Sequence, residues 1–160
     1  MTKNNPRNIS KIIFHNTNNI RKKHGCITFR YDKGLSYLCR KHSKKMAKKE
    51  RIWHGNNIFL TKDYITDDKI SLLDHFLLWL FGGEFAGISG ENCAMMSKGN
   101  VKKGFTHRIS TDKDIAIALN QSWMNSPGHK ANILNKEFKK IGTGVYRRKN
   151  NFYATALFYG

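Results

Sequence analysis

The segment 123–134, with the sequence WMNSPGHKANIL, concentrates residue types from which a chemical site can be built. Pro127 lacks a backbone N–H and disfavours helix at the residue before it, which predicts that one helix ends near Asn125 and that Ser126 caps the next. His129 then lies on the first turn of the second helix, on about the same side as Ser126. A hydroxyl and an imidazole at such a junction are typical of one wall of a site, but a solvent-exposed helix corner would have the same pattern.

Three residues upstream bear on the same chemistry. His54 follows a predicted helix at the turn 53–57, where a side chain can project into a cleft, although the helix dipole also favours a histidine at this end. Glu91, between a glycine and an asparagine, has a context typical of a loop or strand start that directs its carboxylate inward. His42 falls among apolar residues, which favours a hydrogen-bonded core histidine over a ligand.

Periodic patterns predict the elements that would position these residues. Apolar spacing indicates helices at about 8–23, 32–51, 67–81, 111–125 and 127–134. Asp32 is the expected cap of the second helix, and Thr111 with Asp114 is the expected capping box of the fourth. Alternating residues predict strands near 140–147 and 151–158, joined as an antiparallel hairpin, and a third strand near Glu91 would complete a small sheet.

Basic side chains dominate the composition. Lysine and arginine number 29 against 11 acidic residues, which gives a formal net charge of +18 at pH 7. Such a charge attracts nucleic acid, anionic lipid head groups or acidic envelope polymers, but it is also compatible with a solvated surface that has no dedicated partner. The lysines of the helix 32–51 gather on one side of it, opposite the apolar side. No zinc-finger spacing appears among the three cysteines, Cys26, Cys39 and Cys93, so sequence-specific nucleic-acid binding is not expected.

The 160 residues suffice for one domain with a real core. The apolar segment at about 58–89 is expected to pack on this core, or else to form an apolar rim beside a cleft or a surface for a partner. Its longest apolar run, 76–81, is far shorter than the roughly 20 residues that a membrane span needs. The first residues are too polar for a signal peptide, which leaves a cytoplasmic location open.

The order of these motifs resembles the CAP superfamily, which includes cysteine-rich secretory proteins, pathogenesis-related proteins and bacterial SCP-like proteins. The resemblance runs from about His15 to Phe158, and its most specific part is the segment 123–134, which looks closest to the prokaryotic branch. It implies an α+β fold, the CAP-type α-β-α sandwich with a small antiparallel sheet flanked by helices. Residues 1–160 would form a single CAP domain with an apolar insertion at about 58–89. The resemblance also implies an extracellular or cell-envelope location.

CAP domains carry two histidines and two acidic residues around a large central cleft, and the histidines can hold a divalent metal. Transferred to this chain, the resemblance implies a cleft of His54, Glu91, Ser126 and His129, in which serine replaces the second acid. His54 and His129 would be the metal ligands. Imidazole suits zinc, and two histidines without a firm third ligand imply weak binding.

Three functions remain open. The resemblance favours a binding or signalling module with an unknown cleft ligand. Ser126, His129 and Glu91 also have the residue types of a hydrolase nucleophile, base and orienting acid, but no nucleophile-elbow pattern surrounds the serine. The third function is binding of an anionic surface through the basic helix, with envelope polymer, lipid or nucleic acid as the partner. Binding is therefore favoured over catalysis.

Overall fold

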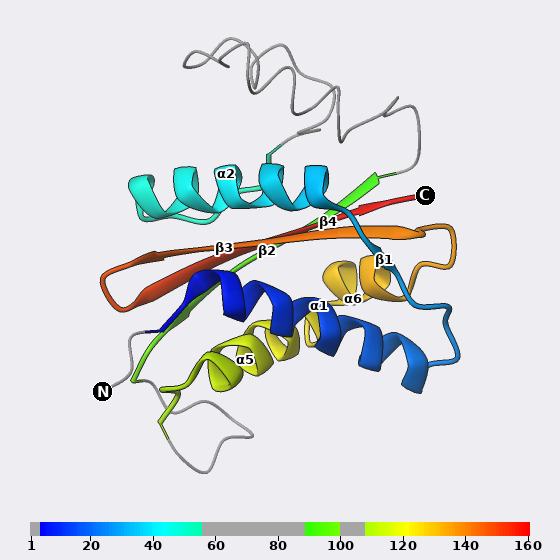
Figure 1. Cartoon of the computed structure of the whole chain (residues 1–160), viewed down its shortest axis with the longest axis horizontal. Helices are drawn as coiled ribbons and strands as arrows, with labels where there is room; N and C mark the ends of the chain where they lie inside the picture. Colours follow the sequence, from blue (N-terminus) through cyan, green and yellow to red (C-terminus); the bar gives the residue numbers. More distant parts are fainter. Residues whose placement is uncertain (1–3, 56–88, 100–107) are drawn as a thin grey trace, which may run out of the picture.

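Four helices and a four-stranded sheet make up the part of the chain that the structure describes, a computed structural model of residues 4–55, 89–99 and 108–160. The elements are α1 (Pro6–Lys23), β1 (Arg30–Tyr31), α2 (Lys33–Lys49), β2 (Ser89–Ser97), α5 (Asp112–Met124), α6 (Pro127–Leu134), β3 (Lys140–Arg148) and β4 (Asn151–Tyr159). Figure 1 shows the sheet between two helical layers, with α2 on one face and α1, α5 and α6 on the other. The predicted α+β sandwich is thus confirmed.

The three long strands of the sheet are antiparallel. β4 pairs with β3 on one side and with β2 on the other, in the overall order β1-β3-β4-β2, so the predicted hairpin and the third strand near Glu91 are confirmed. The sequence pattern does not predict β1, whose two residues pair in parallel with the start of β3 and make the sheet mixed. Two residues are too few to show the alternation by which a strand is identified.

The helices begin close to the expected residues. The Asp32 side chain accepts a hydrogen bond from Leu35 N at 2.9 Å at the start of α2, and Thr111 with Asp114 forms the predicted capping box of α5. Ser126 precedes α6 in an extended conformation, but its side chain makes no capping hydrogen bond. The break before α6 therefore depends on proline at the first helical position rather than on the serine hydroxyl.

Two glycines of β3 allow α2 to lie directly on the sheet. A Cβ at Gly142 would lie 2.3 Å from the backbone carbon of Leu35, and one at Gly144 would lie 2.2 Å from Arg40 N. The Ser43 hydroxyl of α2 donates to the Gly144 carbonyl at 3.0 Å in the same interface. Trp123 is fully buried in the core, which lies mainly between the sheet and the helices α1, α5 and α6.

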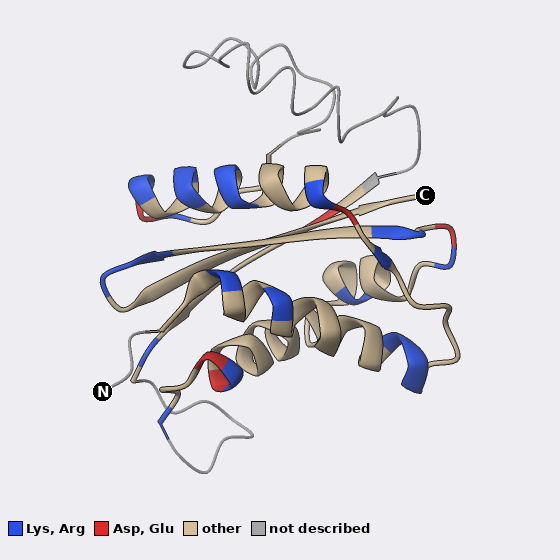
Figure 2. Cartoon of the chain, in the orientation of Figure 1, with Lys and Arg blue, Asp and Glu red and all other residues tan. Residues whose placement is uncertain are grey.

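Lysines and arginines mark the outer side of α2, whereas its inner side is buried (Figure 2). None of the described helices is long and apolar enough to cross a membrane. The predicted helix at 67–81 and nearly all of the apolar insertion at 58–89 lie outside the described residues.

Candidate metal centre around Glu91

Glu91 and three nearby histidines form what we call the candidate metal centre. Glu91 stands near the start of β2, and its side chain is 12% exposed. Its Oε2 accepts a hydrogen bond from Gly55 N at 3.0 Å and lies 3.1 Å from His54 Nδ1. One carboxylate oxygen therefore fixes both the backbone and the imidazole of the segment that follows α2.

His129 lies beside His54, on the first turn of α6. The centroids of the two imidazole rings are 5.6 Å apart, and the ring planes are inclined by 45°. The His54 side chain is 55% exposed, and His129 is half-buried. The structure thus places His54 beside both Glu91 and His129, although the three residues come from different elements.

Two asparagines join the strand of Glu91 to the helix of His129. Asn92 Nδ2 donates to the His129 carbonyl at 3.0 Å. Asn132 Nδ2 lies 2.9 Å from Asn92 Oδ1 and 3.2 Å from the Glu91 carbonyl, so it donates back to β2. These side-chain amides hold α6 against β2, and so they fix the position of His129 relative to Glu91.

His42 is the third histidine, and sequence reasoning treated it only as part of the core. It is fully buried, and its Nε2 lies 2.9 Å from the Trp53 carbonyl, as expected of a hydrogen-bonded core histidine. The same Nε2 also lies 3.7 Å from Glu91 Oε1. His42 Nδ1 and Glu91 Oε1 are both buried without a hydrogen-bond partner among the described residues. The apolar periodicity of α2 marks this position as buried, but it cannot show which polar atom faces it.

Cys93 lies two positions after Glu91 in β2 and belongs to the same cluster. His42, Glu91 and Cys93 each offer one ligand atom, all within 4.8 Å of one another, so this group could hold a metal ion. Burial raises the pKa of the Cys93 thiol well above its ordinary value, which keeps it protonated at neutral pH when no metal is bound. No pattern in the sequence predicts a role for this cysteine.

Burial also changes the proton affinity of the other groups. It raises the pKa of the Glu91 carboxyl, and the hydrogen bond from His54 opposes this rise. It lowers the pKa of both His42 and His129, and the charge of His54 lowers that of His129 further. His42 and His129 are therefore neutral at pH 7, the form in which an imidazole can bind a metal ion.

Ser126 stands apart from this network. It is half-buried at the start of α6, and no hydrogen bond joins its hydroxyl to His129 or Glu91 within the described part of the chain. A hydrolase would need these groups within hydrogen-bond reach of one another. The contacts observed around Glu91 run instead to His54 and Gly55.

Comparison with known proteins gives a family match for the C-terminal part of the chain. The model of the cysteine-rich secretory protein family, CAP, matches residues 83–159, a stretch that includes Glu91, Ser126 and His129. A similar fold occurs in an extracellular SCP-domain protein of Bacillus anthracis, with a TM-score of 0.65, 24% identity and coverage of 96% of this chain and 41% of that one. Residues 83–159 thus match the CAP family, and the described residues share the fold of solved SCP-domain structures.

Other solved structures share this CAP fold at low sequence identity. An outer surface protein of Borrelia burgdorferi has a TM-score of 0.65 and 19% identity, and the alignment covers 99% of this chain and 96% of that protein. The structure of NaASP2 with Zn²⁺ has a TM-score of 0.50 and 12% identity, with 99% and 80% covered. This chain spans less than half of the Bacillus protein. Comparison with curated protein sequences finds no significant match.

Proposed function

We propose that this chain is a binding module whose family cleft lies at the candidate metal centre and holds a divalent metal ion. His54 and His129 bind the ion, Glu91 orients His54, and Ser126 is a neutral neighbour in the cleft. The observation that carries this proposal is the contact of Glu91 Oε2 with His54 Nδ1 beside the ring of His129.

The spacing of the two imidazoles is compatible with one shared ion. Zinc lies about 2.0–2.1 Å from an imidazole nitrogen, so two rings that bind one tetrahedral ion have centroids roughly 5 Å apart. The observed separation is 5.6 Å. This separation is close to the one that a shared ion requires.

The Glu91 contact selects the ligand atom of His54. A carboxylate accepts hydrogen bonds, so His54 Nδ1 carries the proton and Nε2 keeps a lone pair. Histidines that bind metals commonly donate their second N–H to a carboxylate in this way. Glu91 therefore acts on the metal through His54, rather than through a water molecule alone.

Zinc is the ion that the donor set favours, because imidazole is among its preferred ligands. A structure of the similar protein NaASP2 is described as a complex with Zn²⁺, which supports this choice. Two protein ligands leave coordination positions open to water or to a bound ligand. Serine at position 126 supplies no negative charge, so binding should be weak. Similarity to proteins described as extracellular and outer-surface supports an extracellular or envelope location.

Calorimetric titration with zinc tests the assignment. His54→Ala and His129→Ala should each abolish zinc uptake, because either change leaves a single imidazole ligand. His15→Ala is the matched control, since His15 is an exposed histidine on α1 and should leave the affinity unchanged. Ser126→Glu should strengthen binding by adding a carboxylate. Wild-type zinc affinity in either of the first two variants would show that the ligands lie elsewhere.

A further inference from the structure

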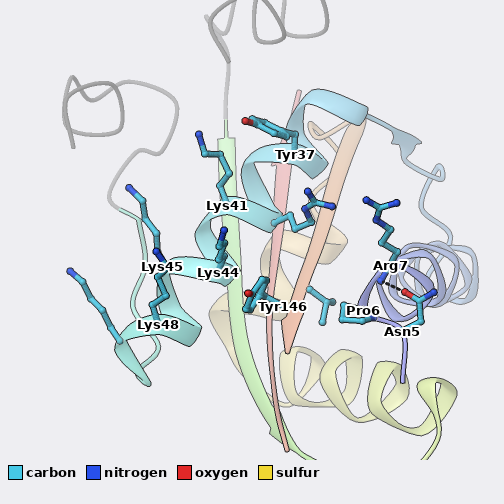
Figure 3. A pocket seen from close by; sticks show the side chains of 12 residues that line it. Asn5, Pro6, Arg7, Tyr37, Lys41, Lys44, Lys45, Lys48 and Tyr146 are labelled. Carbon is cyan, nitrogen blue, oxygen red and sulfur yellow. Dashed lines mark hydrogen bonds between the residues drawn. The ribbon is translucent and has the colours of Figure 1, made fainter. Parts of the chain in front are cut away.

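A second feature of the molecule, beside α2 at the uncovered edge of β3, is independent of the candidate metal centre. A cavity of about 740 Å³ lies between α2, the start of α1 and β3, and we call it the basic groove (Figure 3). Seven of its twelve lining residues are lysine or arginine, and none is acidic. Figure 3 shows Lys44 and Lys48 projecting from α2 on one side, with Arg7 of α1 on the other.

The groove exists because β1 is short. β1 pairs only with Lys140 and Ile141, so no described strand covers the rest of β3 on this side. The helices α1 and α2 lie on opposite faces of the sheet and form the two walls. A smaller cavity of about 310 Å³ continues along the same edge and shares Arg7 and Tyr37 with the groove.

The uncovered edge of β3 is not available for pairing with the strand of another protein at its middle residues. Ser36 Oγ accepts from Thr143 N at 3.1 Å, and Ser10 Oγ donates to the Thr143 carbonyl at 2.8 Å. The side chains that a ligand would meet on the groove walls carry mostly ammonium and guanidinium groups.

We propose that the basic groove binds a single chain of a linear phosphate polymer, by charge and without sequence preference. The lysines of α2 recur at successive helical turns, about 5.4 Å apart, so they present a row of charges to a chain that lies along the helix. A concave site with six basic residues on its α2 wall and Arg7 on the facing wall suits a strand rather than the flat surface of a bilayer. Tyr146 and Tyr37 also line the groove, and Lys41 Nζ lies 5.4 Å from the centre of the Tyr37 ring. If the polymer is a nucleic acid, bases could stack on these rings, at Tyr37 by displacing Lys41.

Fluorescence anisotropy with labelled inorganic polyphosphate and labelled oligothymidylate, over a series of salt concentrations, tests this proposal. Changing Lys41, Lys44, Lys45 and Lys48 to glutamine should weaken binding of both probes at least tenfold. The logarithmic salt slope for oligothymidylate should fall by about 3, because each lost phosphate contact removes roughly 0.7. The double variant Lys44→Gln/Lys48→Gln, at two exposed positions, should produce about half of the change in slope and protects the test against misfolding of the quadruple variant.

The control variant removes the same charge elsewhere. Changing the exposed residues Lys22, Lys23, Lys136 and Lys139 to glutamine should leave both affinities within twofold of wild type. An equal loss in this variant would show that net charge alone binds the polymer and would overturn the proposal.

The remaining measurements identify the source of the ligand. Equal binding of the two probes indicates recognition of the phosphate chain. Tighter binding of oligothymidylate that is lost in Tyr37→Leu or Tyr146→Leu indicates a nucleic-acid strand. Vesicles of phosphatidylglycerol that bind through the same lysines and displace both probes would assign the groove to a membrane surface and refute the proposal. Zinc titration of the lysine variants should match wild type. The result for the basic groove is therefore independent of the result for the metal site.

Discussion

Replacing Gly144 with alanine should push α2 away from the sheet. The new Cβ would lie 2.2 Å from Arg40 N and 2.5 Å from the backbone carbon of Cys39. Carbon atoms in contact are about 3.5–4.0 Å apart, so the helix must retreat by at least about 1 Å. Both clashing groups belong to the backbone of α2, so rotation of a side chain cannot relieve them.

The expected cost is that of an overpacked core, about 1–3 kcal/mol. In a protein of this size each kcal/mol lowers the melting temperature by about 2–4 °C, so Gly144→Ala should melt roughly 2–12 °C below wild type. Differential scanning calorimetry of the metal-free protein measures this change. His42 is carried by the same helix, so its contacts with Trp53 and Glu91 should loosen as well.

Gly128→Ala provides the matched control. A Cβ at Gly128 meets nothing within 4 Å, and the residue lies inside α6 with a negative φ. Alanine is favoured over glycine within a helix by roughly 0.5–1 kcal/mol, so this variant should melt slightly above wild type. If Gly144→Ala melts at or above the wild-type temperature, the close packing of α2 on β3 is not what holds this layer in place.

Three further predictions concern the candidate metal centre. Burial lowers the pKa of His129 below its ordinary value of about 6.5, so this imidazole is neutral at any pH above 6.5. The contribution of His129 to zinc affinity should therefore be constant above pH 6.5 and should decrease at lower pH, where the ring becomes protonated. Calorimetry between pH 5 and 8 measures this change. Glu91→Gln should raise the melting temperature of the metal-free protein at pH 7. The pKa of Glu91 is raised in the folded state, so ionisation of this carboxyl destabilises the fold as pH rises. The increase in melting temperature should therefore vanish near pH 4, where the carboxyl is protonated in both states. A lower melting temperature at pH 7 would contradict the burial argument. Cys93→Ala should leave zinc affinity unchanged, whereas loss of binding would move the metal to the inner group of His42, Glu91 and Cys93.

Local sequence signals account for most of the described fold. Proline at position 127, the acidic cap at Asp32 and the capping box at Thr111 each act within a few residues, so they place helix ends without knowledge of the rest of the chain. The alternating hairpin at the C-terminus is similarly local. β1 escapes prediction because its pairing with β3 depends on residues more than 100 positions away.

The candidate metal centre depends on contacts that local patterns do not encode. Glu91 meets His54 and Gly55 across 37 and 36 positions, and only the order of family motifs suggested that His54 and Glu91 belong together. His42 follows the apolar period of α2, so its pattern is that of an ordinary core residue. Its contact with Glu91 becomes visible only in the folded structure, where α2 packs on the sheet that contains β2. The ligands of the metal and the identity of the cleft ligand stay predictions.

The amide of Asn132 has a consequence for how copies of this protein meet in solution. β2 is the outer strand next to β4 in the described sheet, and an outer strand offers free backbone groups to which a strand of a second molecule can pair, a common route to aggregation. Asn132 already occupies the Glu91 carbonyl, and α6 lies over this part of the strand. The helix that carries His129 therefore also shields a sheet edge from self-association. Asn132→Ala would uncover the edge, and light scattering at increasing protein concentration should show a larger mean mass than that of the wild-type chain at the same concentration.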